Sequence, residues 1–195
     1  MSSHNNLDAV TKTLANRIWE GIKDDKQLLK IIKSPEQISF QSPQDAQAKS
    51  AQISVFLYKV AELTSMRNQP QNPQEPRTLM YLSLRYLITP FTKNAEEDQI
   101  ILGKILQIFA ETPVLRGSSL QGSLTEAGDD LRIMLDELAV DELNKLWTML
   151  SLPYRLCVSY TVLPVKIGSA KTEKSRVIVR SVQSTVKLKV SGKKT

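Results

Sequence analysis

The chain has few side chains that could act as nucleophiles, general bases or metal ligands. It holds one histidine, His4, in a polar N-terminal stretch, and one cysteine, Cys157, at an alternating position of an expected strand. A Ser–His or Cys–His pair needs an imidazole held by a scaffold, and a zinc site needs three or four His, Cys or carboxylate ligands. We therefore expect no catalytic residue, no metal site and no cofactor, and we interpret Cys157 as a buried apolar side chain.

Neighbouring carboxylates are the other candidates, since two of them across a cleft can hydrolyse a glycosidic bond. They occur at 96–98, 129–130 and 136–137. The first group is typical of a helix start, where the helix dipole favours acids, and the second of a turn before a strand. The sequence also contains no G-x-G-x-x-G and no Walker-type lysine loop. These patterns favour a protein that is not an enzyme and takes no small-molecule substrate, with a hydrolase as the alternative.

The basic residues are concentrated at the C-terminal end. Residues 166–195 hold nine basic residues and one acid, Glu173, in a chain whose net charge is +6. Such a segment can bind nucleic acid, lipid headgroups or an acidic protein. It has no aromatic residue for base stacking, and its charges alternate with Val, Ile and Leu as in a strand that pairs with a protein edge. We therefore predict protein contacts through a set of four residues, with nucleic-acid binding as the less favoured alternative: Arg176, Arg180, Lys187 and Lys189.

Three helices are predicted from apolar residues that recur every three or four positions. The first runs from Leu7 to near residue 24, with Asn6 as its N-cap; the second follows Asn94 and ends at Pro113; the third spans 141–150.

Strands are predicted where apolar residues alternate. These segments are 51–64, 78–88, 131–136 and 156–165, with a short edge strand at 38–40 inside a linker. The proline-rich stretch 68–76 is predicted to be a loop. The element order predicts the α+β class: a single domain with a mostly antiparallel sheet and about three packed helices. We place this domain at 1–168 and a basic extension at 169–195, which forms either an extra strand or a partner-binding arm.

The expected cellular compartment follows from three features that the sequence lacks: a membrane span, a secretory signal and an internal disulfide. The apolar runs are shorter than the roughly 20 residues needed to span a bilayer, and the N-terminus lacks the pattern of a secretory signal. A single cysteine cannot form an internal disulfide. We therefore expect no transmembrane segment and a cytoplasmic location.

Several stretches resemble one known family. They are LMYLSLRYLITPFT at 79–92, AEEDQIILGKILQIFAETPVL at 95–115, SVFLYKVAE at 54–62, LRIMLDELAVDELNKLWTML at 131–150 and PYRLCVSYTV at 153–162. Together they resemble the tail-terminator, or cap, family of extracellular contractile injection systems, which are phage-tail-like particles of the antifeeding prophage and Photorhabdus virulence cassette type. The resemblance runs from about residue 7 to 167.

The resemblance implies a structural protein with a phage tail-terminator-like fold. It implies a homo-hexameric ring that ends the inner tube and the contractile sheath and couples them, as part of a phage-tail-like particle. Another baseplate or tube-associated component, such as a tube-initiating protein, is the closest alternative. We also expect a contact with a partner at Pro113, Val114 and Leu115, where an apolar stretch follows the second helix.

Overall fold

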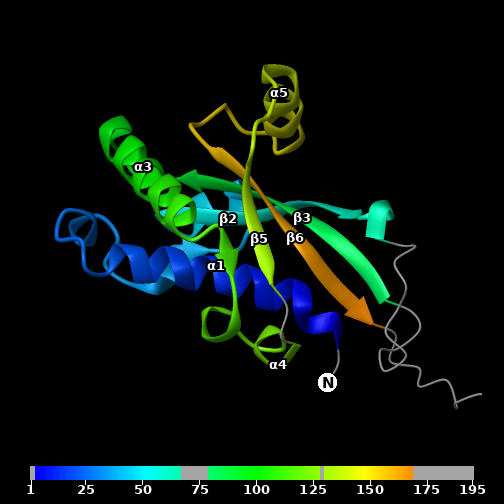
Figure 1. Cartoon of the computed structure of the whole chain (residues 1–195). Coiled ribbons are helices and arrows are strands. Elements are labelled where there is room, and N and C mark those ends of the chain that lie inside the picture. Colours follow the sequence, from blue (N-terminus) through cyan, green and yellow to red (C-terminus); the bar gives the residue numbers. More distant parts are fainter. Residues whose placement is uncertain (1–2, 67–78, 128–129, 169–195) are drawn as a thin grey trace, which may run out of the picture.

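A six-stranded sheet forms the framework of the protein. The computed structural model describes residues 3–66, 79–127 and 130–168 (Figure 1). Across the sheet the strand order is β1-β2-β3-β6-β5-β4. All neighbouring strands are antiparallel except β1 and β2, which are parallel. The strands are β1 (Ile38–Ser39), β2 (Ile53–Glu62), β3 (Leu79–Pro90), β4 (Val114–Leu115), β5 (Leu131–Asp136) and β6 (Val158–Gly168).

Helices lie against both faces of this sheet, but unequally. The helices are α1 (Asn6–Ile22), α2 (Pro43–Ala48), α3 (Ala95–Glu111), α4 (Leu124–Ala127) and α5 (Val140–Met149). Helices α1 and α3 contact each other and share one apolar core with the sheet, whereas α5 stands apart from them at the top of Figure 1. Short 3-10 turns occupy Ser3–Asn5, Leu28–Lys30, Pro35–Gln37, Thr64–Met66 and Gly117–Ser119.

The main core lies between the sheet and the helices α1 and α3. Strand alternation sends Leu84, Tyr86 and Ile88 of β3 into this core, and helical spacing does the same for the buried stripes of α1 and α3. The two helices approach closely at Gly21, where a Cβ atom would lie 2.3 Å from Cδ1 of Ile108. A larger residue at position 21 would therefore force the Ile108 side chain to move.

The opposite face carries a smaller cluster under α5. Its buried members are Leu87, Trp147 and Leu150, with Cys157 among the partly buried residues packed against them. Leu87 lies between Tyr86 and Ile88 in β3, so it points away from the main core.

The sheet is curled, and two register shifts contribute to the curl. One lies between Leu57 and Lys59 in the β2–β3 pair, and the other between Leu82 and Leu84 in the β3–β6 pair. An extra residue in one strand bends it and increases the local twist.

The predicted α+β class with a mostly antiparallel sheet and about three packed helices is confirmed. Strand 131–136 is found with the predicted bounds. The prediction for Asn6 is wrong: Asn5 precedes α1 without a side-chain cap bond, and Asn6 is buried, where its amide donates to the Lys166 carbonyl at 2.7 Å. Helix α2 lies where a linker was predicted. The predicted loop 68–76 and the extension 169–195, with its possible extra strand, lie outside the described residues.

Candidate interaction surfaces

Among the described residues, the side chains that could act as nucleophiles, bases or metal ligands include His4, Cys157 and the carboxylates. His4 is exposed in the turn before α1. Cys157 packs beside Trp147, and burial raises the pKa of its thiol, which disfavours the reactive thiolate. Within 3–66, 79–127 and 130–168, no group of three or more His, Cys, Asp and Glu could hold a metal ion. In the same ranges no helix has both the length and the apolar character needed to cross a membrane.

A chain of polar contacts connects the strands on the α5 face. The hydroxyls of Tyr58 and Ser159 share a hydrogen bond of 3.0 Å, and Ser159 donates to Asp136 at 3.4 Å. Asp136 in turn pairs with Arg85 at 3.4 Å. Burial raises the pKa of the Tyr58 phenol, which stays neutral as a hydrogen-bonding group. Each of these side chains has a partner, so this series of contacts joins β2, β6, β5 and β3 without a ligand.

The structure describes three of the seven interface residues expected from the sequence. Pro113 is exposed and Val114 is half-buried, but Leu115 is fully buried in the main core. Only Pro113 and part of Val114 are therefore accessible to a partner. Arg176, Arg180, Lys187 and Lys189 lie outside the described residues.

A group of exposed apolar side chains surrounds α5, and we call it the α5 apolar surface. Val140 is 81% exposed and Met149 is 63% exposed, although both residues are large and apolar. Such a concentration is typical of an interaction site. Its members come from β5, α5 and the loop that follows: Met134, Val140, Met149, Tyr154 and Leu156. Leu135 is also exposed, but it pairs with Tyr160 and lies on the face of the main core. Sequence reasoning missed this surface, although Met149 lies off the apolar stripe of α5 that Leu143, Leu146 and Trp147 form.

A cleft of about 950 Å³ lies beside the N-terminal end of α3, and we call it the basic cleft. Four cationic side chains line it: Lys30, Lys33, Lys93 and Arg155. Glu97 is the one acidic residue in the lining. Side-chain amides add hydrogen-bonding groups, and Ile31, Ala51 and Phe91 add an apolar floor. The lining comes from chain segments far apart in the sequence, so no local motif could predict the cleft.

An ion pair holds one wall of the basic cleft in place. Asp98, buried in the first turn of α3, accepts hydrogen bonds from the backbone amide of Thr92 at 3.0 Å and from its hydroxyl at 2.7 Å. Its second oxygen accepts from Arg155 at 3.1 Å. The Arg155 guanidinium also lies 5.1 Å from the centre of the Phe91 ring. These contacts fix the loop before β6 against the N-terminal end of α3.

Comparisons with known proteins place this fold among terminators of contractile particles. A family model described as the Pvc16 N-terminal domain matches residues 9–181. An extracellular contractile injection system structure, described as the PVC sheath/tube terminator in the extended state, is similar with a TM-score of 0.64 at 18% identity over 94% of this chain. The tube-terminating cap of the anti-feeding prophage is similar with a TM-score of 0.52 at 22% identity over 76% of this chain. No curated protein matches the sequence.

The lengths of these relatives differ from the length of this chain. The aligned part spans 64% of the PVC terminator and 53% of the anti-feeding prophage cap. The family match continues past the predicted domain boundary at 168 and includes Arg176 and Arg180, but not Lys187 and Lys189.

Proposed function

Because the chain belongs to the Pvc16 N-terminal domain family, we propose that it is a structural subunit that terminates the inner tube and sheath of an extracellular contractile injection system. The observation that carries this proposal is the shared fold, over 94% of the chain, with a protein described as a sheath/tube terminator. In this role the protein catalyses no reaction, takes no small-molecule substrate and binds no nucleic acid. It assembles in the cytoplasm as part of a phage-tail-like particle.

The partners in this proposal are the inner tube protein, the contractile sheath protein and further copies of the same chain. A stack of rings grows because each ring exposes the surface that the next ring needs, a heterologous contact that does not close. A terminator must match one such surface and present a different one outward. We propose that this ring is homo-hexameric, which is the copy number that the resemblance to the cap family implies.

The described residues offer surfaces suited to these contacts. The α5 apolar surface supplies apolar area for a tube or sheath subunit, and Pro113 and Val114 lie at the β4 edge. We propose that residues 1–168 form the terminator domain and that 169–195 form an arm. On this arm Arg176, Arg180, Lys187 and Lys189 would meet an acidic surface of sheath or tube, while strand-like pairing supplies main-chain bonds.

The test is a tube-length assay. Purified tube protein is polymerised with increasing amounts of the full chain, and tube lengths and tube ends are imaged by electron microscopy. We expect ring-shaped density at one end and a mean length that falls as the chain is added. Tubes of unchanged length with bare ends would contradict the proposal, whereas more numerous tubes growing from the ring would indicate the tube-initiating alternative.

A further inference from the structure

The ring of the proposed function requires a contact between neighbouring copies, and the structure indicates which two surfaces make it. We propose that the basic cleft of one copy receives the acidic turn of the next copy. The acidic turn comprises residues 136–142, between β5 and the first turn of α5. This inference rests on the proposed ring, but it does not depend on what the ring terminates.

The basic cleft has cationic groups available for a partner. Lys30, Lys33 and Lys93 are exposed, and none of them forms an ion pair with another described residue. With Arg155 and the single acid Glu97, the lining carries a net charge of +3. Arg155 keeps its partner Asp98 outside this lining, so the three lysines supply the free positive charge.

The acidic turn has the complementary charge. Glu137, Asp141 and Glu142 are exposed, and none of them is ion-paired among the described residues. Lys145, one helical turn later, is the first basic residue after them. The turn therefore presents three negative charges to a cleft with three positive ones.

Apolar groups on the two surfaces also match. Val140, at the centre of the acidic turn, is 81% exposed in the single copy. The lining of the basic cleft contains Ile31, which is half-buried, beside the buried Ala51 and Phe91. Packing of the Val140 side chain against Ile31 would bury apolar surface on both copies while the charges pair around it.

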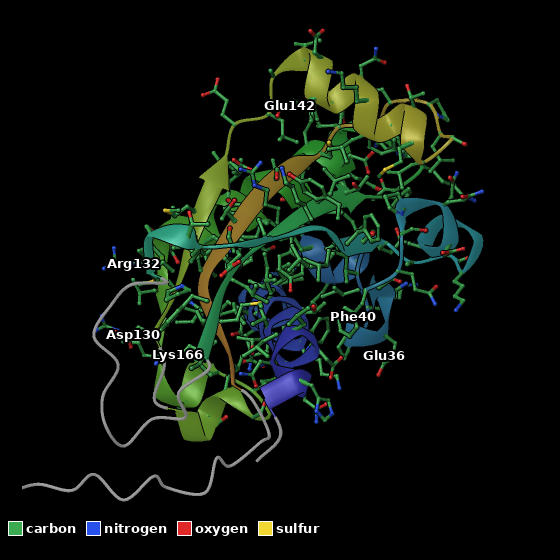
Figure 2. The ribbon with its side chains drawn as sticks, turned by 90° about the vertical axis from the view of Figure 1, so that its right-hand side faces the viewer. Glu36, Phe40, Asp130, Arg132, Glu142 and Lys166 are labelled. Atoms are coloured by element: carbon green, nitrogen blue, oxygen red, sulfur yellow. The ribbon has the colours of Figure 1, made fainter. Side chains whose placement is uncertain are left out.

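The two surfaces lie apart within one copy, which favours a contact between copies. The cleft includes Gln37 and Gln52, which precede the edge strand β1 and its neighbour β2, whereas the acidic turn follows β5, and β3 and β6 lie between β2 and β5 in the sheet. Figure 2 shows Glu142 at the top of the molecule and Glu36, which precedes the cleft residue Gln37 in the sequence, below it and to the right. One copy cannot bring its own turn into its own cleft, so the contact is head-to-tail and can close into a ring.

Charge reversal tests this contact without touching buried residues. The cleft variant is K30E/K93E and the turn variant is E137K/D141K; Glu142 stays unchanged because its carboxylate accepts from the Ala139 amide at the start of α5. The matched control is K26E/K59E, in which both lysines are exposed, lie outside the cleft and form no ion pair with another described residue. The mass of each full-length variant is measured by native mass spectrometry and sedimentation, with a thermal melt to check folding.

The expected result is loss of the ring in either variant and its recovery when the charges are exchanged. The cleft variant and the turn variant should each remain monomeric, whereas their equimolar mixture, or one chain with all four substitutions, should recover the wild-type ring mass. The control should assemble like the wild type. Three outcomes would overturn the inference. They are a cleft or turn variant that assembles normally, a four-substitution chain that fails to recover the ring, and a wild-type chain that stays monomeric with and without tube protein. Charge-dependent rings that leave tube length unchanged would support it while contradicting the proposed function.

Discussion

The face of the sheet under α1 and α3 and the face under α5 differ in how completely their apolar residues are buried. The first is closed by two 17-residue helices over a continuous core. The second has a 10-residue helix over three buried side chains, and exposed apolar residues surround it. Since burial of apolar surface drives folding, the first face contributes most of the stability, and the second leaves apolar surface free for partners.

The largest expected effect comes from a cavity in the main core. Leu84→Ala removes a fully buried side chain of β3 and should lower the free energy of unfolding by about 3–4 kcal/mol. Leu150→Ala, in the smaller cluster, should cost about 2 kcal/mol because that site already borders solvent. Urea unfolding followed by circular dichroism measures both. Equal losses would show that the two faces support the fold equally.

Alkaline pH should weaken the main-core face through Tyr160. Burial raises the pKa of Tyr160 to about 12, whereas an unfolded tyrosine titrates near ~10. Between these values the unfolded chain has released its proton and the folded chain has not, so the free energy of unfolding falls as pH rises. Tyr160→Phe should reduce this slope, and the part that remains should come from Tyr86, whose pKa burial also raises. Tyr154→Phe, which changes an exposed ring, is the control in urea titrations at each pH.

A smaller effect is expected where α1 and α3 approach each other. Gly21→Ala would place its Cβ inside the space of Ile108, and this overpacking should cost about 1–2 kcal/mol despite the better helix propensity of alanine. Adding Ile108→Val, which shortens the clashing side chain, should recover part of the loss. A double-mutant cycle from thermal melts measures the coupling, and strictly additive effects would contradict the close approach.

The smallest effect on stability should come from the α5 apolar surface. Val140→Ser and Met149→Ser change exposed side chains, so each should alter the free energy of unfolding by less than about 0.5 kcal/mol. The proposed function nevertheless predicts weaker association with tube or sheath. Thermal melts measure the stability of each variant, and pull-down with assembled tubes measures its association, so the two effects are measured separately. A large loss of stability would show that this surface belongs to the fold.

The sequence alone predicts those helices and strands whose apolar periodicity extends over several consecutive residues. Helix α3 was predicted from Asn94 and its apolar stripe, and Asn94 does accept a hydrogen bond from the Glu96 amide at 3.0 Å. Strand β5 was predicted from six alternating residues. By contrast, the two-residue strand β4 is too short to show alternation, and it forms because β5 offers a partner.

Contacts between distant positions could not be predicted in this way. Asn6 looked like a helix cap, but it is buried against a carbonyl 160 positions away in the sequence. Asp98 looked like one of three acids at a helix start, yet it is the buried partner of Arg155. The basic cleft is likewise a product of the fold, because loops before and after the sheet strands must first be brought together to form it.

The short edge strands leave part of the sheet open to other chains. Strand β1 has two residues and pairs with β2 only at Ile53 and Ser54, so residues 55–62 have no strand partner on their outer side among the described residues. Long, flat edges act as templates on which other chains polymerise. The register shift between Leu57 and Lys59 twists this edge, and Lys59 adds an exposed charge, and both features discourage such growth. Strand addition here would therefore require a partner whose shape and charge match this edge.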